Sequence, residues 1–99
     1  MVKLLMSWDI QAGREQPYLE FVVREFAPGL MRMGLHLTEA WYTIYGNGSQ
    51  VLIGGVTSDI DAMRKFLAGE DWHTFHKKLL GYVTNYKQKV VPAGGQFQL

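Results

Sequence analysis

The segment 35-LHLTEAWYTIYGNGSQVLIGGV-56 carries the clearest structural signal in this chain of 99 residues. Residues with high strand propensity lie on both sides of its centre. At the centre, Asn47 and Gly48 are residue types that readily adopt the two positive φ angles of a type I′ turn. The segment therefore predicts a tight β-hairpin in which Gly46 pairs with Ser49.

Side chains alternate between the two faces of a sheet, so this pairing assigns each hairpin residue to a face. It also places Trp41 opposite Gly54. The face expected under the helices holds Ala40, Tyr42, Ile44, Val51, Ile53 and Gly55. The other face holds Glu39, Trp41, Thr43, Tyr45, Gln50, Leu52, Gly54 and Val56. This second face is too apolar for open water and too polar for a sealed core, which favours a partner subunit or a pocket there.

The segments on either side of the hairpin complete an order of strands and helices. Apolar runs over Val2–Trp8 and Tyr82–Val91 predict two further strands. Helical periodicity over Pro17–Phe26 and Asp59–Leu80 predicts the helices between them. The resulting order, βαββαβ, is typical of a ferredoxin-like α+β sandwich with a four-stranded antiparallel sheet. We expect one such domain over residues 1–99.

Each helical segment carries an apolar stripe. The stripe of the first helix consists of Leu19, Val22, Val23 and Phe26. The stripe at the end of the second helical region consists of Trp72, Phe75, His76, Leu79 and Leu80. We expect Pro28-Gly29 to end the first helix and Gly69 to split the second helical region into two helices. This spacing puts His76 on the apolar side of its helix and His73 in water.

Composition excludes several classes of function. The formal net charge is +1 and Lys and Arg are scattered along the chain, which argues against a nucleic-acid partner. The chain has no cysteine, which excludes disulfides, thiolate metal sites and a cysteine nucleophile. No segment approaches the roughly 20 apolar residues that a membrane span needs, so no membrane partner is expected. We therefore expect a cytoplasmic protein.

The chain has three Trp, five Tyr and five Phe, more aromatic residues than a thin two-layer core can easily hide. Some of them are expected to line a pocket or a subunit interface. The candidate ligand-binding residues are Trp8, Trp41, Tyr45, Trp72 and Tyr86. They could stack against a flat aromatic ligand, or they could equally fill a subunit contact.

The strand and helix order, the split second helical region and the two-faced apolar strands resemble the dimeric α/β-barrel superfamily, in which two ferredoxin-like sheets pack face to face. The stretch Asp71–Lys77 is similar to an aromatic-rich helix in the antibiotic-biosynthesis monooxygenase branch. This resemblance implies a homodimer formed through the sheet face that holds Trp41 and Leu52. It also implies either a cofactor-independent, monooxygenase-like enzyme or a small protein that binds an aromatic ligand.

His76 is the first candidate catalytic residue. A partly buried imidazole beside Trp72 could act as a general base or a hydrogen-bond partner. Alternatively, it is a core histidine bonded to a backbone carbonyl or a tyrosine. In the haem-degrading members of the superfamily a histidine on this helix ligates iron, so the resemblance implies His76 as the residue for haem, a cofactor that is otherwise not expected. No metal is expected, because His73 and His76 diverge around the helix.

Glu39 is the second candidate catalytic residue. A carboxylate enclosed between two sheets could have a raised pKa and remove a proton from a substrate. Alternatively, Glu39 forms an ion pair across a subunit interface with Lys87, Lys89 or Arg32. A third class of function, a non-catalytic module that binds a ligand or only assembles, stays open beside both enzymatic hypotheses.

Overall fold

The structure of the protein, a computed structural model, describes residues 1–43 and 50–93. Its elements in chain order are β1 (Val2–Ile10), α1 (Glu15–Phe21), the π-helical turn η1 (Val22–Phe26), α2 (Ala27–Arg32), β2 (His36–Tyr42), β3 (Val51–Thr57), α3 (Ile60–Ala68), α4 (Glu70–Leu80) and β4 (Val83–Pro92). All strand pairings are antiparallel, in the order β2-β3-β1-β4. The predicted ferredoxin-like α+β sandwich with a four-stranded sheet is confirmed.

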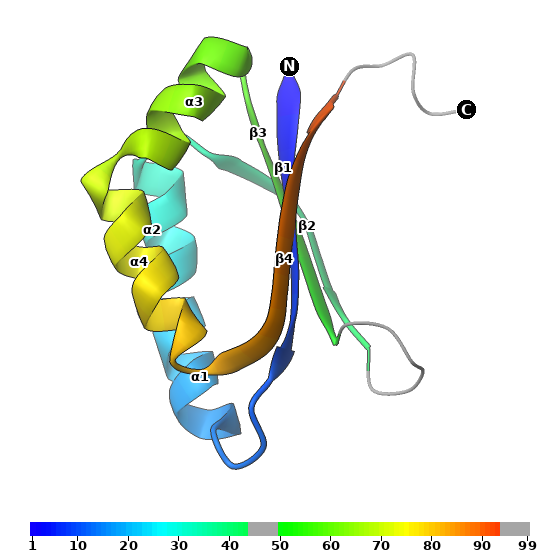
Figure 1. Cartoon of the computed structure of the whole chain (residues 1–99), viewed down its shortest axis with the longest axis vertical. Coiled ribbons are helices and arrows are strands. Elements are labelled where there is room, and N and C mark those ends of the chain that lie inside the picture. The colour runs from blue at the N-terminus through cyan, green and yellow to red at the C-terminus, as the bar shows by residue number, and fades with distance from the viewer. Residues whose placement is uncertain (44–49, 94–99) are drawn as a thin grey trace.

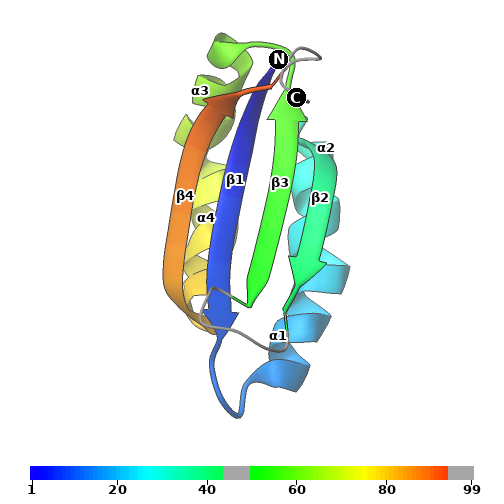
Figure 2. The same ribbon diagram turned by 90° about the vertical axis from the view of Figure 1, so that its right-hand side faces the viewer.

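The helices form one layer and the sheet forms the other. Figure 1 shows α1, α2, α3 and α4 together on one side of the sheet. Figure 2 shows the opposite side of the sheet, over which no described helix passes. We call these sides the helix face and the open face. The core lies between the two layers.

Alternation along β1 decides which side chains enter the core. Leu4, Met6 and Trp8 are fully buried on the helix face, whereas Lys3, Leu5 and Ser7 between them are partly exposed on the open face. The helix layer adds Phe26, Leu30, Met63 and Leu79, which are also fully buried. Each such side chain contributes about 1.5–3 kcal/mol by leaving water. The same period of two places Val51, Ile53 and Gly55 on the helix face and Glu39, Leu52 and Gly54 on the open face, as predicted.

The predicted register of the hairpin is wrong by two residues. Trp41 lies opposite Leu52, not opposite Gly54, and the residue paired with Gly54 is Glu39. A shift of two keeps every side chain on its predicted face. Gly54 suits this pairing because a Cβ atom there would lie 2.6 Å from Oε1 of Glu39. The turn at Asn47-Gly48, together with the predicted positions of Ile44 and Tyr45, lies outside the described residues.

The first helix also departs from its predicted stripe. Leu19 and Val23 are 55% and 61% exposed, while Tyr18 and Phe21 are buried in their place. The helix does not end at Pro28-Gly29 but continues to Arg32. In η1 the N–H of Ala27 donates to the carbonyl of Val22, five residues back. Such a widened turn accommodates a proline, because the residue lacks an N–H and its ring would clash with the carbonyl four residues earlier in an α-helix.

The second helical region matches its prediction in its bounds and its split, but Leu80 of the predicted stripe is 44% exposed, while Trp72 and Leu79 are buried. The Asp59 carboxylate accepts a 2.8 Å hydrogen bond from the N–H of Ala62 and caps α3. Gly69 ends α3 and precedes α4, so the predicted split is confirmed. Gly29 lets α2 approach α4, since a Cβ atom at Gly29 would lie 2.6 Å from the ring of Phe75.

Two adjacent glycines in β3 offer a matched test of the packing. A Cβ atom at Gly55 would lie 2.6 Å from Cγ of buried Leu35, whereas the Gly54 position meets the end of the flexible Glu39 side chain. We expect Gly55→Ala to lower the free energy of unfolding by about 1–3 kcal/mol through overpacking. Gly54→Ala should change it by less than about 1 kcal/mol. Urea denaturation of both variants checks this, and equal losses would contradict the packing described for Leu35.

Candidate functional site

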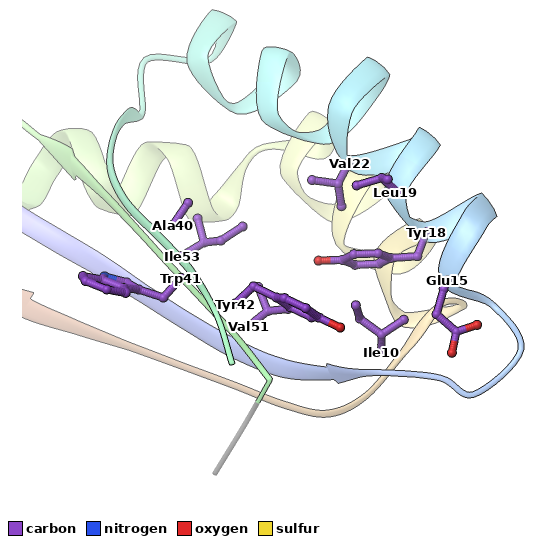
Figure 3. A pocket seen from close by; sticks show the side chains of 10 residues that line it. All are labelled: Ile10, Glu15, Tyr18, Leu19, Val22, Ala40, Trp41, Tyr42, Val51 and Ile53. Carbon is purple, nitrogen blue, oxygen red and sulfur yellow. The ribbon is translucent and has the colours of Figure 1, made fainter. Parts of the chain in front are cut away.

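A cavity of about 430 Å³ opens between the first helix and the edge of the sheet. It lies on the helix face, bounded by α1 and η1 on one side and by β2, β3 and the end of β1 on the other (Figure 3). Its lining residues are Ile10, Glu15, Tyr18, Leu19, Val22, Ala40, Trp41, Tyr42, Val51 and Ile53. Most of these side chains are apolar, so the cavity favours an apolar occupant.

The shape of the cavity follows from the two elements that bound it. The π-helical turn carries Val22 beside Leu19 on the cavity side, and Ala40 is a small residue on the facing edge strand. Ala40 leaves space that a larger side chain would fill. Val51 and Ile53 form the apolar floor on β3. The departure from regular α-helix therefore contributes directly to the site.

Tyr18 supplies the inner polar atom of this cavity. Its side chain is only 6% exposed, and its hydroxyl oxygen accepts a 3.0 Å hydrogen bond from Nε1 of Trp8, which is fully buried. Burial raises the pKa of Tyr18, partly offset by the hydrogen bond from Trp8. The hydroxyl therefore stays protonated at neutral pH.

The polar side chains at the mouth of the cavity, unlike Tyr18, are exposed to solvent. Glu15 lies in the first turn of α1, where a carboxylate is favoured by the helix dipole, and its side chain is exposed. Tyr42, from the end of β2, is 59% exposed. Glu15 is the charged residue of the lining, so a negative charge stands at the entrance of an otherwise neutral cavity.

His76 lies in a different part of the core, between α4 and β4. Its ring stacks on Trp72 at 5.1 Å between centroids and lies 4.6 Å from the ring of Tyr86. Its Nε2 atom is buried and has no hydrogen-bond partner among the described residues. Burial lowers the pKa of His76, and His73 adds a smaller effect in the same direction. The lowered pKa favours the neutral form of this partly buried imidazole.

Trp8 connects the histidine cluster to the cavity. The Tyr86 ring stacks on the Trp8 ring at 5.9 Å and an interplanar angle of 10°. The Tyr86 hydroxyl donates a 2.6 Å hydrogen bond to Oε1 of Gln88. Burial strongly raises the pKa of Tyr86. Trp8 thus contacts Tyr86 on one side of the core and Tyr18 on the other.

The predicted ligand-binding residues do not form a single site. Trp8, Trp72 and Tyr86 come together around His76 as packed core, not as the lining of the cavity. Trp41 borders the cavity from β2, but its ring is 65% exposed and extends to the open face (Figure 3). Tyr45 lies outside the described residues.

Glu39 and His76 lie on opposite faces of the sheet. The Glu39 carboxylate accepts a 2.6 Å hydrogen bond from the Lys3 ammonium in the same chain and a second from Thr38. The bond from Lys3 is the largest cause of a lowered pKa of Glu39. The raised pKa expected of a general base is therefore not found, because Lys3 favours the ionised carboxylate.

Sequence reasoning missed Tyr18. The apolar stripe was assigned to Leu19, Val22, Val23 and Phe26, which put Tyr18 outside the core-facing set. A tyrosine next to a proline in the first turn of a helix gave no separate signal. A buried Trp8 needs a hydrogen-bond acceptor, because the indole N–H is only a donor, and this need could have identified Tyr18.

The described ranges 1–43 and 50–93 contain no group of three or more His, Asp or Glu side chains placed to hold a metal ion. Among the helices of these ranges, none combines the length and apolarity needed to cross a membrane.

Comparison with known proteins reveals similarity of fold. No family model matches the chain, and no curated protein matches it. Among solved structures, a NIPSNAP family protein from Agrobacterium tumefaciens has a TM-score of 0.72 at 19% identity, over 99% of this chain and 97% of that chain. A Dabb family protein with a ferredoxin-like fold from Mesorhizobium loti has a TM-score of 0.74 at 12% identity, over 94% of this chain and 97% of that chain. These likenesses support the ferredoxin-like fold predicted from the sequence.

The buried imidazole predicts a pH dependence of stability. Because the folded protein holds the pKa of His76 below its ordinary value of 6.5, the unfolded chain takes up a proton at a higher pH than the folded chain. The His76 contribution therefore makes the free energy of unfolding fall as pH drops below about 6.5. We expect His76→Phe, which keeps an aromatic ring, to flatten this part of the pH profile. His36→Gln, at an exposed histidine of β2, is the control. An unchanged profile in His76→Phe would contradict the burial of the imidazole.

Proposed function

We propose that the protein is a homodimeric binding protein for a small, largely apolar ligand, which it holds in the cavity between α1, η1 and the sheet. The observation that carries this proposal is the cavity itself, with about 430 Å³ of space and an apolar lining around one inner hydroxyl group. Ligand pockets in proteins typically measure about 300–1,000 Å³ and pair apolar walls with a few polar groups. A ligand of one to three aromatic rings suits this space.

The walls supply the affinity that such a ligand needs. Leu19 and Val22 face Val51 and Ile53 across the cavity, so a flat apolar molecule would contact aliphatic side chains on both sides. Burial of apolar surface contributes about 25 cal/mol per Å². Leu19 is 55% exposed without a ligand and would lose part of that exposure on binding.

A binding function is better supported than the enzymatic hypotheses. A general base must come within hydrogen-bond reach of the substrate, directly or through one water molecule. His76 is not among the residues that line the cavity, and its ring is packed against Trp72 and Tyr86. Monooxygenase-like chemistry or haem ligation through His76 therefore has no support from this placement.

The homodimer is a separate part of the proposal, supported by the open face of the sheet (Figure 2). Trp41 is 65% exposed there and pairs with Leu52 across the strands. A hollow of about 700 Å³ on this face is lined by Leu5, Met6, Ser7, Leu52, Lys87, Gln88 and Lys89. Large exposed apolar patches with polar rims are typical of protein contacts, and a second copy of the same sheet is a surface of the same kind.

Filling the cavity tests the binding function. Ala40 is an exposed residue of β2 that lines the cavity, so Ala40→Phe should occupy ligand space without disturbing buried packing. We expect the neutral fluorescent probe N-phenyl-1-naphthylamine to bind the unchanged protein saturably. Ala40→Phe should weaken this binding about tenfold or more. Thr38→Phe, which adds the same side chain on β2 outside the cavity, should not. Equal binding by both variants would place the probe elsewhere.

A charge on the open face tests the dimer. Leu52→Asp would bring a charged carboxylate into the proposed interface, where its removal from water costs several kcal/mol even beside Lys87 and Lys89. We expect the dissociation constant of the dimer, measured by sedimentation equilibrium, to rise about 100-fold or more. Val23→Asp, on the exposed outer face of the helix layer, is the control. A Leu52→Asp protein that dissociates no more readily than this control would overturn the assignment of the interface.

A further inference from the structure

The Tyr18 hydroxyl has a proton that no described residue accepts. A tyrosine hydroxyl can donate one hydrogen bond and accept others. Its contact with Trp8 uses only the acceptor side, because the indole Nε1–H is a donor and offers no acceptor. The orientation of the bond is therefore fixed by chemistry, and the Tyr18 proton remains available.

The available proton lies inside the cavity. Figure 3 shows the Tyr18 ring extending between the helix and the strands, with its oxygen directed inward and away from Glu15. Val22, Val51 and Ile53 also line the cavity and offer no side-chain acceptor, and no hydrogen bond joins the Tyr18 and Tyr42 hydroxyls among the described residues. A buried donor surrounded by apolar side chains gains most from a ligand that brings its own acceptor.

The entrance selects against negative charge. Among the described residues that line the cavity, only Glu15 is charged, and it stands at the mouth. None of these described residues supplies a cation to compensate a ligand anion. A carboxylate ligand would meet repulsion at the mouth and desolvation within.

We propose that the ligand is a neutral, mostly apolar molecule with one carbonyl oxygen, a ketone, aldehyde or ester, which accepts a hydrogen bond from the Tyr18 hydroxyl. This inference rests on the proposed binding function and adds the chemical class of the ligand. Burial, which raises the pKa of Tyr18, supports it because the hydroxyl keeps its proton across the physiological pH range.

A matched set of naphthalenes tests the assignment, each measured by displacement of N-phenyl-1-naphthylamine. 2-Acetylnaphthalene and 2-ethylnaphthalene share ring and approximate shape but differ in the carbonyl oxygen. We expect Tyr18→Phe to weaken binding of the ketone about 3- to 10-fold, the range of one net hydrogen bond, and to leave the hydrocarbon unchanged. Tyr82→Phe removes a hydroxyl outside the cavity and should leave the ratio of the two affinities as it is.

A separate comparison tests the effect of the negative charge of Glu15 on ligand binding. 2-Naphthoate should bind more weakly than 2-acetylnaphthalene, and Glu15→Gln should reduce that difference. A ketone-to-hydrocarbon ratio that is the same in Tyr18→Phe and the unchanged protein would overturn the carbonyl assignment while leaving the binding function in place. Failure of all three naphthalenes to displace the probe from the unchanged protein would overturn both.

A spectroscopic measurement avoids dependence on the folding of Tyr18→Phe, a substitution that leaves the Trp8 N–H without its acceptor. The carbonyl stretch of 2-acetylnaphthalene labelled with ¹³C at the carbonyl can be recorded when bound to the unchanged protein. We expect it to lie at lower frequency than in hexane, as a hydrogen bond to oxygen weakens the C=O bond. A stretch at the hexane position would contradict the proposed contact.

Discussion

The hydrogen bond between Trp8 and Tyr18 is the constraint on which the core and the cavity both depend. Trp8 is fully buried near the end of β1, and its indole N–H must find an acceptor there. The Tyr18 hydroxyl, 3.0 Å away, provides it. This hydrogen bond holds α1 over the sheet. Tyr86 stacks on the indole ring, and Phe26 packs against it in an edge-to-face arrangement. Deleting either partner would leave a buried polar group unpaired, at a cost of about 1–3 kcal/mol.

The cavity is a consequence of how the same helix continues. After Tyr18 the helix widens into η1, because Pro28 has no N–H and its ring would clash with a carbonyl of a regular helix. The widened turn carries Val22, and the preceding turn of α1 carries Leu19, above the edge of the sheet, where Ala40 is too small to fill the space. A proline that signals the end of a helix in sequence is here accommodated within one.

Much of the fold follows from periodicity in the sequence. The order of elements, the split at Gly69 and the faces of the hairpin depend on periods of two and 3.6 residues, which local sequence carries. The register of the hairpin could not be predicted from periodicity, because it depends on the number of residues in the loop between the two strands. The prediction paired Trp41 with Gly54, two residues away from its actual partner Leu52. The stripe of the first helix failed because the π-helical turn changes the rotation between the residues before it and Phe26. With Phe26 in the core, Tyr18 and Phe21 lie on the buried side and Leu19 does not.

The candidate site was harder to predict than the fold because it depends on contacts between distant segments. His76 was correctly placed on the inner side of α4, yet sequence could not show that it packs away from the cavity. Glu39 was correctly placed on the open face, but its partner proved to be Lys3. The role of Tyr18 could be recognised only from its contact with Trp8, which lies ten residues earlier on another element.

The most direct measurement is a crystal structure of the protein with 2-acetylnaphthalene bound. The account predicts the ring between Val22 and Ile53, with the carbonyl oxygen about 2.7–2.8 Å from the Tyr18 oxygen. The hydrogen bond from Trp8 should persist. A cavity closed by side chains, or a ring bound only at the open face of the sheet, would contradict it.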